Sequence, residues 1–190
     1  MIELLEPEIL DDWGDFSADL EGRIAWPYLD TDDPPVVTVG LGCALFTAEA
    51  FTALPWLRGD GLSAIARETL AAWDFLHTMR GGQVARAYAY PGHLHLEDAA
   101  IDALAQTRLR ANAEQLARTF LDFPTWPTAA KRGALSIAWA CGADFPRTWP
   151  LWSAAAKAQD WAGCAANCTI QKNPKRSEAQ RQLFLAAVAA

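Results

Sequence analysis

The chain has 190 residues, of which 52% are hydrophobic, and a formal net charge of −7. This length and apolar content predict a globular protein with a packed core rather than a disordered chain. The acidic balance argues against nucleic acid as the main partner, because binding to phosphates requires a basic face. No apolar run approaches the roughly 20 residues that a membrane-spanning helix needs, so we expect no membrane insertion.

The N-terminal segment, residues 2–7, is acidic and lacks the basic and then apolar stretches of a secretory signal peptide. We therefore expect the protein to be made in the cytoplasm and to reach any other compartment by another route. The cysteines Cys43, Cys141, Cys164 and Cys168 include no Cys-x-x-Cys pair, which argues against a zinc ribbon. Buried thiols and, in an oxidising compartment, a disulfide both remain open.

The first predicted helix spans residues 7–20, where apolar side chains recur at helical spacing: Ile9, Leu10, Trp13, Phe16 and Leu20. Glu21 stands at its end, and Gly22 follows in the position where helices favour glycine. A second carboxylate, Asp30, comes nine residues after Glu21 in a Tyr-Leu-Asp-Thr turn. The segment therefore carries two carboxylates close together in sequence.

Residues 36–39 are β-branched and bounded by Pro35 and Gly40, so they predict a strand that carries the hydroxyl of Thr38. Two carboxylates and a group that holds a water are what glycosidic bond cleavage requires. From the residues alone, helix capping and a polar turn are the more common explanation of the same pattern.

Seven further helices are predicted, over residues 48–54, 62–79, 97–121, 129–141, 150–157, 161–168 and 176–188. Thr47 and Asp160 are expected to cap two of them, and Gly142 to end the helix of residues 129–141. The intervening residues 83–95 are predicted to be irregular. His93 and His95 in this stretch could bind a metal, but no third ligand lies near them in sequence. A loop is therefore favoured, and we expect no metal site and no cofactor.

The order Glu-Gly, Tyr-x-Asp and Thr-x-Gly-x-Gly resembles the active-site segment of bacteriophage-type lysozymes, that is, glycoside hydrolase family 24 and its pesticin-like relatives. The matching positions are Glu21, Gly22, Tyr28, Asp30, Thr38, Gly40 and Gly42. Two features depart from the family pattern. Its histidine after the second glycine is Cys43 here, and the loop between Asp30 and Thr38 is longer.

Segments in the second half of the chain are similar to pesticin-like lysozymes in the same order: Phe123–Pro127, Ala134–Gly142, Trp149–Trp152, Asp160–Ala166 and Arg176–Phe184. The family usually has asparagine at the position of Ala140. The resemblance implies an α+β, predominantly helical, lysozyme-like fold in a single domain of residues 1–190. A small β-sheet lobe would span about 20–60 and a helical lobe about 62–190, with the helix of residues 7–20 packed on the helical lobe.

The resemblance also implies an enzyme, a muramidase that cleaves between N-acetylmuramic acid and N-acetylglucosamine in bacterial peptidoglycan. Glu21 would be the general acid, Asp30 would stay ionised and activate a water, and Thr38 would hold that water. Tyr28, between the carboxylates, and Trp126, beside a proline break, are the candidate substrate-binding residues. The implied outcome is inverting, for which the two carboxyl groups lie about 6.5–9.5 Å apart.

An acidic lysozyme-like chain without a signal peptide is similar to the toxin domain of a secreted antibacterial effector, for instance one delivered by a type VI secretion system. Such a protein acts in the periplasm or on the cell wall of a target bacterium and needs a cognate immunity protein. A phage endolysin is the other expectation. Two alternatives remain open: a catalytically inactive lysozyme-fold module that binds the wall or a protein, suggested by Cys43 and Ala140, and a helical adaptor with an acidic binding surface.

Overall fold

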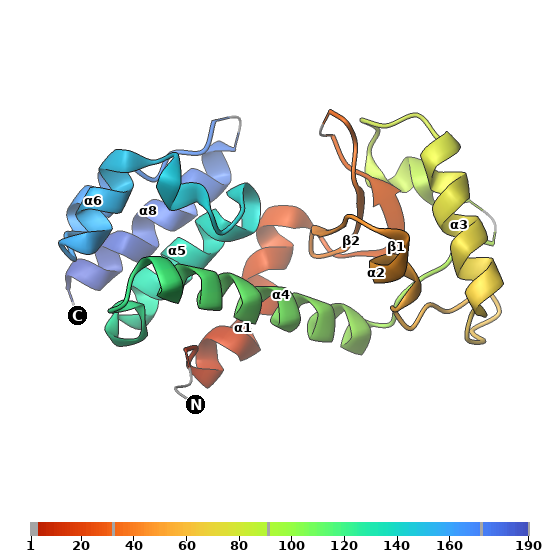
Figure 1. The fold of residues 1–190 in the computed structure, drawn as a ribbon, viewed down its shortest axis with the longest axis horizontal. Helices are drawn as coiled ribbons and strands as arrows, with labels where there is room; N and C mark the ends of the chain where they lie inside the picture. Colours follow the sequence, from red (N-terminus) through yellow and green to blue (C-terminus); the bar gives the residue numbers. More distant parts are fainter. Residues whose placement is uncertain (1–3, 32, 91, 172, 190) are drawn as a thin grey trace. The chain divides into compact units, whose positions relative to one another are not determined.

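A computed structural model describes residues 4–31, 33–90, 92–171 and 173–189 (Figure 1). Within these residues the chain is mostly helical, with one three-stranded antiparallel sheet, so the predicted α+β, predominantly helical fold class is confirmed. The α-helices are α1 (Pro7–Glu21), α2 (Ala48–Thr52), α3 (Ala66–Thr78), α4 (Asp98–Thr119), α5 (Thr128–Cys141), α6 (Pro150–Lys157), α7 (Trp161–Ala166) and α8 (Pro174–Val188). The strands are β1 (Ile24–Leu29), β2 (Val37–Gly40) and β3 (Cys43–Leu45), and short 3-10 helices are η1 (Ala85–Tyr88), η2 (Phe123–Thr125) and η3 (Phe145–Arg147).

The chain forms two compact units, which we call the helical unit and the sheet unit. The helical unit comprises the described parts of Met1–Trp13 and Thr107–Ala190, and the sheet unit comprises Gly14–Gln106. The predicted small lobe ended near residue 60, whereas the sheet unit continues through α3 and into α4. It does so because the backbone of Leu57 pairs with that of His95. Ile101 of α4 also lies against Gly40 of the sheet.

The sheet has the order β1-β2-β3, with Tyr28 opposite Thr38 and Val39 opposite Cys43. Sequence analysis assigned no strand to β1, which contains Pro27. Proline is tolerated there because β1 is an edge strand with an irregular register between Ile24 and Tyr28. In an edge strand, a backbone N–H that points away from the neighbouring strand forms no hydrogen bond within the sheet, so a proline at such a position removes none.

Each of the eight predicted helices is present, with ends that differ from the prediction by at most four residues. The largest difference is in α3, which begins at Ala66 instead of residue 62. The backbone N–H of Leu62 donates to Asp60 Oδ1 (3.1 Å), and Ser63 pairs with Leu57, so both are held in a turn. Ile65 N–H then donates to the Glu68 carboxylate (2.9 Å) and starts the helix.

Both predicted caps are confirmed. The Thr47 hydroxyl accepts a hydrogen bond from Ala50 N–H (3.2 Å) at the start of α2. The Asp160 carboxylate accepts one from Gly163 N–H (2.9 Å) at the start of α7. Each side chain satisfies a backbone donor that has no partner within its helix.

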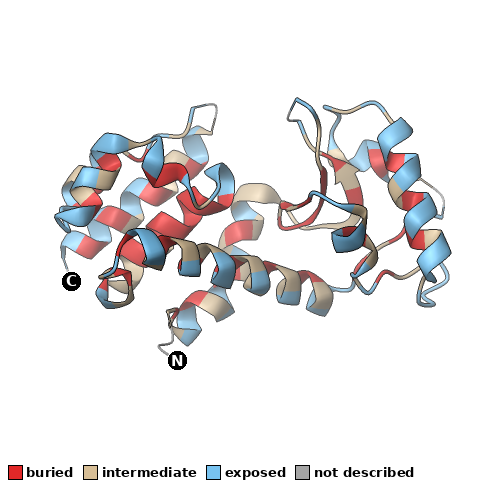
Figure 2. Ribbon diagram, in the orientation of Figure 1, coloured by how far each residue is buried: buried red, intermediate tan, exposed pale blue. Residues whose placement is uncertain are grey.

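The core of the helical unit is built around α5, which is buried along most of its length (Figure 2). Gly133 of α5 allows α8 to approach closely, since a Cβ at this position would lie 2.7 Å from the Phe184 ring. Aromatic rings fill the surrounding space, with Trp152 in edge contact with Phe184 (5.8 Å between centroids) and Phe145 (4.7 Å). As predicted, Gly142 ends α5. In the part of the chain that the structure describes, no helix is both long and apolar enough to cross a membrane.

Candidate active site on the sheet unit

Tyr28, Asp30 and Thr38 lie on one face of the sheet. Tyr28 and Thr38 are directly opposite each other in the antiparallel pair, and opposite residues share a face. Asp30 lies just beyond the end of β1, but its N–H continues the pairing by donating to the Val36 carbonyl, so the alternation along the chain places it on the same side as Tyr28. The other face carries the apolar residues Leu29, Val37, Val39 and Leu45, which are all buried. The sheet thus separates a polar face from an apolar core face.

Asp30 is held in place by the backbone of Val36. Its N–H donates to the Val36 carbonyl (3.0 Å), and its Oδ1 accepts from the Val36 N–H (2.8 Å). The Asp30 carbonyl accepts a third bond, from the N–H of Gly82 (3.2 Å). A carboxylate accepts several hydrogen bonds, so this arrangement orients the group and is compatible with a further bond to a water.

Thr38 is also hydrogen-bonded to the backbone of Val36. Its hydroxyl donates to the Val36 carbonyl oxygen (3.2 Å), and the residue is 4% exposed. With the hydroxyl proton directed at Val36, the Thr38 oxygen acts as an acceptor toward the sheet face. The Asp30 carboxylate and the Thr38 hydroxyl are therefore both positioned by one residue of the chain.

Glu21 is the last residue of α1, and its side chain lies against the turn between β2 and β3. A Cβ at Gly42 in that turn would be 3.5 Å from Glu21 Cδ and 3.6 Å from Oε2. Gly42 also has φ +77°, a left-handed backbone conformation that residues with a side chain rarely adopt. Close by in sequence, Arg23 donates to Asp98 (2.8 Å) and Asp102 (2.9 Å) of α4, which fixes the connection between α1 and β1.

Tyr28 interacts electrostatically with both carboxylates, those of Glu21 and Asp30. Burial of its phenol raises the pKa of Tyr28 to about 12, and the negative charges of Glu21, Asp30 and Cys43 act in the same direction. Both carboxylates are consequently within electrostatic range of a single hydroxyl group. The phenol stays protonated at neutral pH and is a hydrogen-bond donor.

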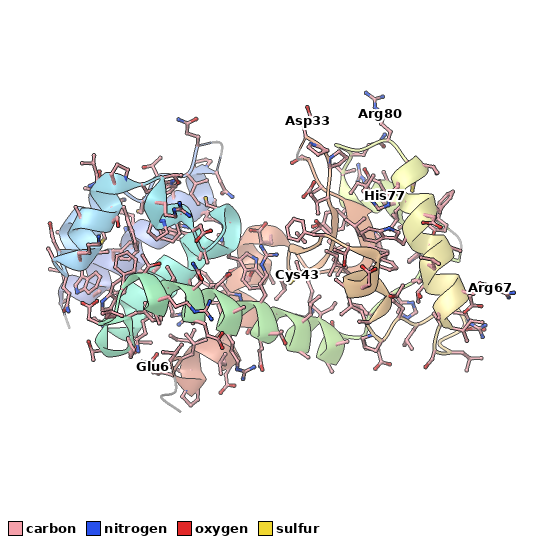
Figure 3. The ribbon with its side chains drawn as sticks, in the orientation of Figure 1. Glu6, Asp33, Cys43, Arg67, His77 and Arg80 are labelled. Atoms are coloured by element: carbon pink, nitrogen blue, oxygen red, sulfur yellow. The ribbon has the colours of Figure 1, made fainter. Side chains whose placement is uncertain are left out.

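Cys43 stands where the resemblance implies a histidine. It is 2% exposed and lies opposite Val39 in the β2–β3 pair, on the sheet (Figure 3). Its thiol is therefore part of the packed sheet rather than a polar group on the surface. Asp33, in contrast, lies at the outer end of the loop between β1 and β2 (Figure 3).

Trp126, the other candidate for sugar binding, belongs to the helical unit and is 2% exposed. Its ring packs against Phe120 (5.1 Å between centroids), Phe123 (5.2 Å) and Trp161 (5.0 Å). This packing leaves the ring no exposed face on which a sugar could stack. We therefore do not include Trp126 among the residues proposed to bind substrate.

Sequence analysis missed the residues that support Asp30 from outside the sheet. Gly81 and Gly82 follow α3 in the chain. Gly82 bonds to the Asp30 carbonyl, and a Cβ at Gly81 would lie 2.6 Å from Cγ of Pro35. The glycine pair lets this loop close on both residues, a role that the Gly-Gly dipeptide alone does not specify.

Across the described ranges, no three His, Cys, Asp or Glu side chains are grouped as metal ligands. His93 packs its ring against Trp26 (5.7 Å between centroids), and its Nδ1 forms a hydrogen bond with the Tyr90 carbonyl. All four cysteines are among the described residues, and none forms a disulfide.

The sequence matches no protein-family model and no curated protein.

Proposed function

We propose that this chain is a muramidase, a glycoside hydrolase that cleaves between N-acetylmuramic acid and N-acetylglucosamine in bacterial peptidoglycan. The observation that carries the proposal is the anchoring of the Asp30 carboxylate and the Thr38 hydroxyl to Val36. These groups share their sheet face with Tyr28, whose hydroxyl lies within electrostatic range of Glu21. An acid, a base and a water-binding group are the parts that glycoside hydrolysis requires.

In the proposed reaction, Glu21 donates a proton to the leaving glycosidic oxygen as the bond to the anomeric carbon breaks. A water held between Asp30 and Thr38 attacks that carbon. The water donates one hydrogen bond to the Thr38 oxygen and loses its other proton to the Asp30 carboxylate. The negative charge of Asp30 also stabilises the positive charge that develops on the sugar ring. Proton exchange with solvent then restores both carboxyl groups.

Tyr28 contributes a hydrogen-bond donor that stays protonated throughout the working pH range, because its pKa is raised to about 12. Its position between the carboxylates suits contact with a sugar hydroxyl or with the Glu21 carboxylate. Attack by a water that Asp30 activates, on the side opposite to the leaving oxygen, inverts the anomeric carbon. We therefore propose an α-configured reducing end as the first product from the β-linked polymer.

The proposed setting is delivery to a target bacterium, as a toxin domain of a secreted effector or as a phage endolysin. A net charge of −7 disfavours electrostatic attraction to cell walls that carry anionic polymers. Delivery into the periplasm or release at the wall overcomes this disadvantage. A producing cell with an effector of this kind would need a cognate immunity protein.

The proposal is tested on purified peptidoglycan by measuring new reducing ends and released muropeptides. Glu21→Gln and Asp30→Asn should each lower the rate about 10²–10⁴-fold, the usual effect of removing a general acid or base. Each has a matched control: Glu8→Gln changes an exposed carboxylate on the same helix, and Asp33→Asn changes one in the loop after Asp30. Both controls should keep the wild-type rate.

Folded wild-type protein that releases no reducing ends from any peptidoglycan would overturn the proposal. Co-sedimentation of that inactive protein with peptidoglycan would then identify a wall-binding module, the alternative that the buried Cys43 favours. Absence of both lysis and co-sedimentation would favour the protein adaptor.

A further inference from the structure

The sheet unit contains a cavity of about 600 Å³ that the proposed reaction does not use. It lies beside α3, and its lining includes Arg58, Asp60, Glu68, Phe75, Tyr90 and Leu94. The volume is in the range of small-ligand sites, about 300–1,000 Å³. The lining combines charged groups with aromatic and aliphatic ones, which suits a ligand that has an apolar part and a charged end.

The charged part of the lining is built from one cation and two anions. The Arg58 guanidinium donates through Nε to Asp60 Oδ1 (3.2 Å) and through a terminal nitrogen to Oδ2 (2.9 Å). Its other terminal nitrogen donates to Glu68 Oε1 (3.3 Å). Because all three nitrogens are engaged by carboxylates, Arg58 is poorly disposed to bind an additional anion. These three side chains carry a formal net charge of −1, and the neighbouring Arg67, which also lowers the pKa of Glu68, is not part of the lining, so the lining favours a cation.

Backbone hydrogen bonds fix these carboxylates. Leu62 N–H donates to Asp60 (3.1 Å), and Ile65 N–H donates to Glu68 (2.9 Å). These backbone bonds are the largest cause of the lowered pKa of each carboxyl group, and Arg58 lowers both further. The two groups therefore remain ionised at neutral pH and keep a fixed geometry.

The apolar part of the lining is aromatic. Phe75 and Tyr90 meet edge to face, with 5.1 Å between ring centroids, and Phe75 is 46% exposed. Leu94 adds an aliphatic surface. An alkyl chain that ends in an ammonium group matches this lining, since its methylenes contact the apolar residues and its charge contacts carboxylates and ring faces.

One connection of the chain links this cavity to the candidate active site. The segment between α3 and α4 bonds to Asp30 through Gly82 and then contributes Tyr90 and Gly92 to the cavity. In peptidoglycan, short peptides with a diamino acid are attached to the muramic acid. Where the side-chain amine of this residue is not consumed in a cross-link, it ends an alkyl chain as an ammonium group.

We propose that the cavity beside α3 binds the ammonium-bearing side chain of the diamino acid in the stem peptide of peptidoglycan. This inference rests on the proposed muramidase function and specifies a part of its substrate. It implies preference for stems whose side-chain amine is free over stems whose amine is consumed in a cross-link. Binding there would hold the glycan strand on the sheet unit independently of the sugar contacts.

The test uses the full chain with Glu21→Gln and a synthetic stem tetrapeptide that contains lysine. Binding is followed by amide and aromatic NMR shifts, together with a second peptide whose lysine amine is acetylated. We expect the free-amine peptide to shift residues of α3 and Tyr90, and acetylation to weaken binding at least tenfold. Equal binding of both peptides, or shifts confined to other surfaces, would overturn the inference.

Charge variants give the second measurement. Glu68→Gln and Asp60→Asn keep hydrogen-bonding side chains but remove one negative charge each, and each should weaken the free-amine peptide roughly two- to fivefold. Phe75→Ala should weaken binding of this peptide because it removes an aromatic ring from the lining of the cavity. Asp74→Asn, an exposed carboxylate on the same helix outside the lining, is the matched control and should change nothing. An effect of Asp74→Asn equal to that of Glu68→Gln would also overturn the inference.

The two proposals fail in different ways. Hydrolysis of peptidoglycan without peptide binding at α3 overturns the inference and leaves the muramidase proposal intact. Peptide binding at α3 without hydrolysis supports the binding site and overturns the muramidase proposal. Activity on peptide-free glycan strands provides a further distinction, because Glu68→Gln should leave that activity at the wild-type level.

Discussion

The helical unit and the sheet unit use their polar and aromatic residues in opposite ways. In the helical unit, Trp126, Trp152 and Phe184 are all buried, and the rings of Trp152 and Phe184 pack against each other in the core around α5. In the sheet unit, Tyr28, Asp30 and Thr38 are gathered on one face of a small sheet and fixed by backbone groups. Changes in the first unit should therefore alter stability, and changes on the sheet face should alter chemistry. Four predictions test this difference.

The largest expected effect is on the stability of the helical unit. Phe184→Ala removes a fully buried ring that fills the space between α8, Gly133 and Trp152. We expect the free energy of unfolding to fall by about 3–5 kcal/mol, because the site is left with a cavity. Urea unfolding followed by tryptophan fluorescence measures the loss, and Leu185→Ala at an exposed position on the same helix is the control.

The same variant should keep the hydrolysis rate per folded molecule at low temperature. A loss below about 1 kcal/mol would contradict the assignment of Phe184 to a close-packed core. A folded Phe184→Ala protein without activity would contradict the division of roles between the units.

Alkaline pH provides a second comparison, because each unit contains a weak acid whose pKa is raised. Burial raises the pKa of Cys164 in the helical unit to about 12, and the charges of Asp160 and Cys168 add to this effect. Burial likewise raises the pKa of Tyr28 in the sheet unit to about 12. Unfolded Cys and Tyr lose their protons near pH 9 and 10, so the unfolded state is favoured as the pH rises from these values to 12.

We expect stability to be unaffected by these groups below pH 9 and to fall above it, by up to about 4 kcal/mol for Cys164 and about 3 kcal/mol for Tyr28. Urea unfolding at successive pH values measures this decline. Cys164→Ala should reduce the decline that begins near pH 9, and Tyr28→Phe the decline that begins near pH 10; the rest comes from Cys141, Cys168 and Tyr90, whose pKa values burial also raises. If the stability of both variants falls with pH as steeply as that of wild type, the pKa values of Cys164 and Tyr28 are not raised as the structure indicates.

The secondary structure of the helical unit could be predicted from its sequence more completely than that of the sheet unit. Helical spacing and a glycine after the last turn, Gly22 for α1 and Gly142 for α5, were sufficient to predict these two helices, since an amphipathic face and a C-terminal glycine are both local signals. The sheet was predicted only in part. β1 contains a proline and is an edge strand, and β3 has three residues, so neither has a local pattern that distinguishes it from a loop.

The candidate site shows the same limit. Glu21, Tyr28, Asp30 and Thr38 were chosen from the order of residues along the chain, and the structure brings them together in one unit. The bonds that hold Asp30 and Thr38 come from Val36 and Gly82, whose contribution is a backbone N–H or C=O. Every residue type except proline offers an N–H, so sequence alone cannot single out these positions. Trp126 was chosen for its neighbouring prolines, and the burial of its ring depends on distant residues.

A third prediction separates the Thr38 hydroxyl from the shape of its side chain. Thr38→Val keeps the volume and removes the group that we propose holds the water. The rate of peptidoglycan hydrolysis should fall roughly tenfold to a hundredfold, within the range of a lost positioning contact. Stability should change by about 1 kcal/mol, since one hydrogen bond to Val36 is lost.

Thr52→Val is the control for Thr38→Val, because the Thr52 hydroxyl also donates to a backbone carbonyl, that of Glu49 (3.3 Å). It should have the same small effect on stability and none on rate. Equal rates for Thr38→Val and wild type would remove Thr38 from the proposed mechanism.

The smallest expected effect compares two glycines with the same φ angle within the sheet unit. Gly42 and Gly61 both have φ +77°, but a Cβ added at Gly42 would lie within 4 Å of the Glu21 side chain, whereas one added at Gly61 would meet open space. Gly42→Ala and Gly61→Ala should each lower the free energy of unfolding by about 1–2 kcal/mol, the cost of a side chain in the left-handed region. Only Gly42→Ala should also lower the rate of hydrolysis, because the added methyl group touches the proposed acid. Since the backbone strain is similar in the two variants, any difference in rate between them reports the contact with Glu21, and equal rates would contradict the expected disturbance of Glu21 by the added methyl group.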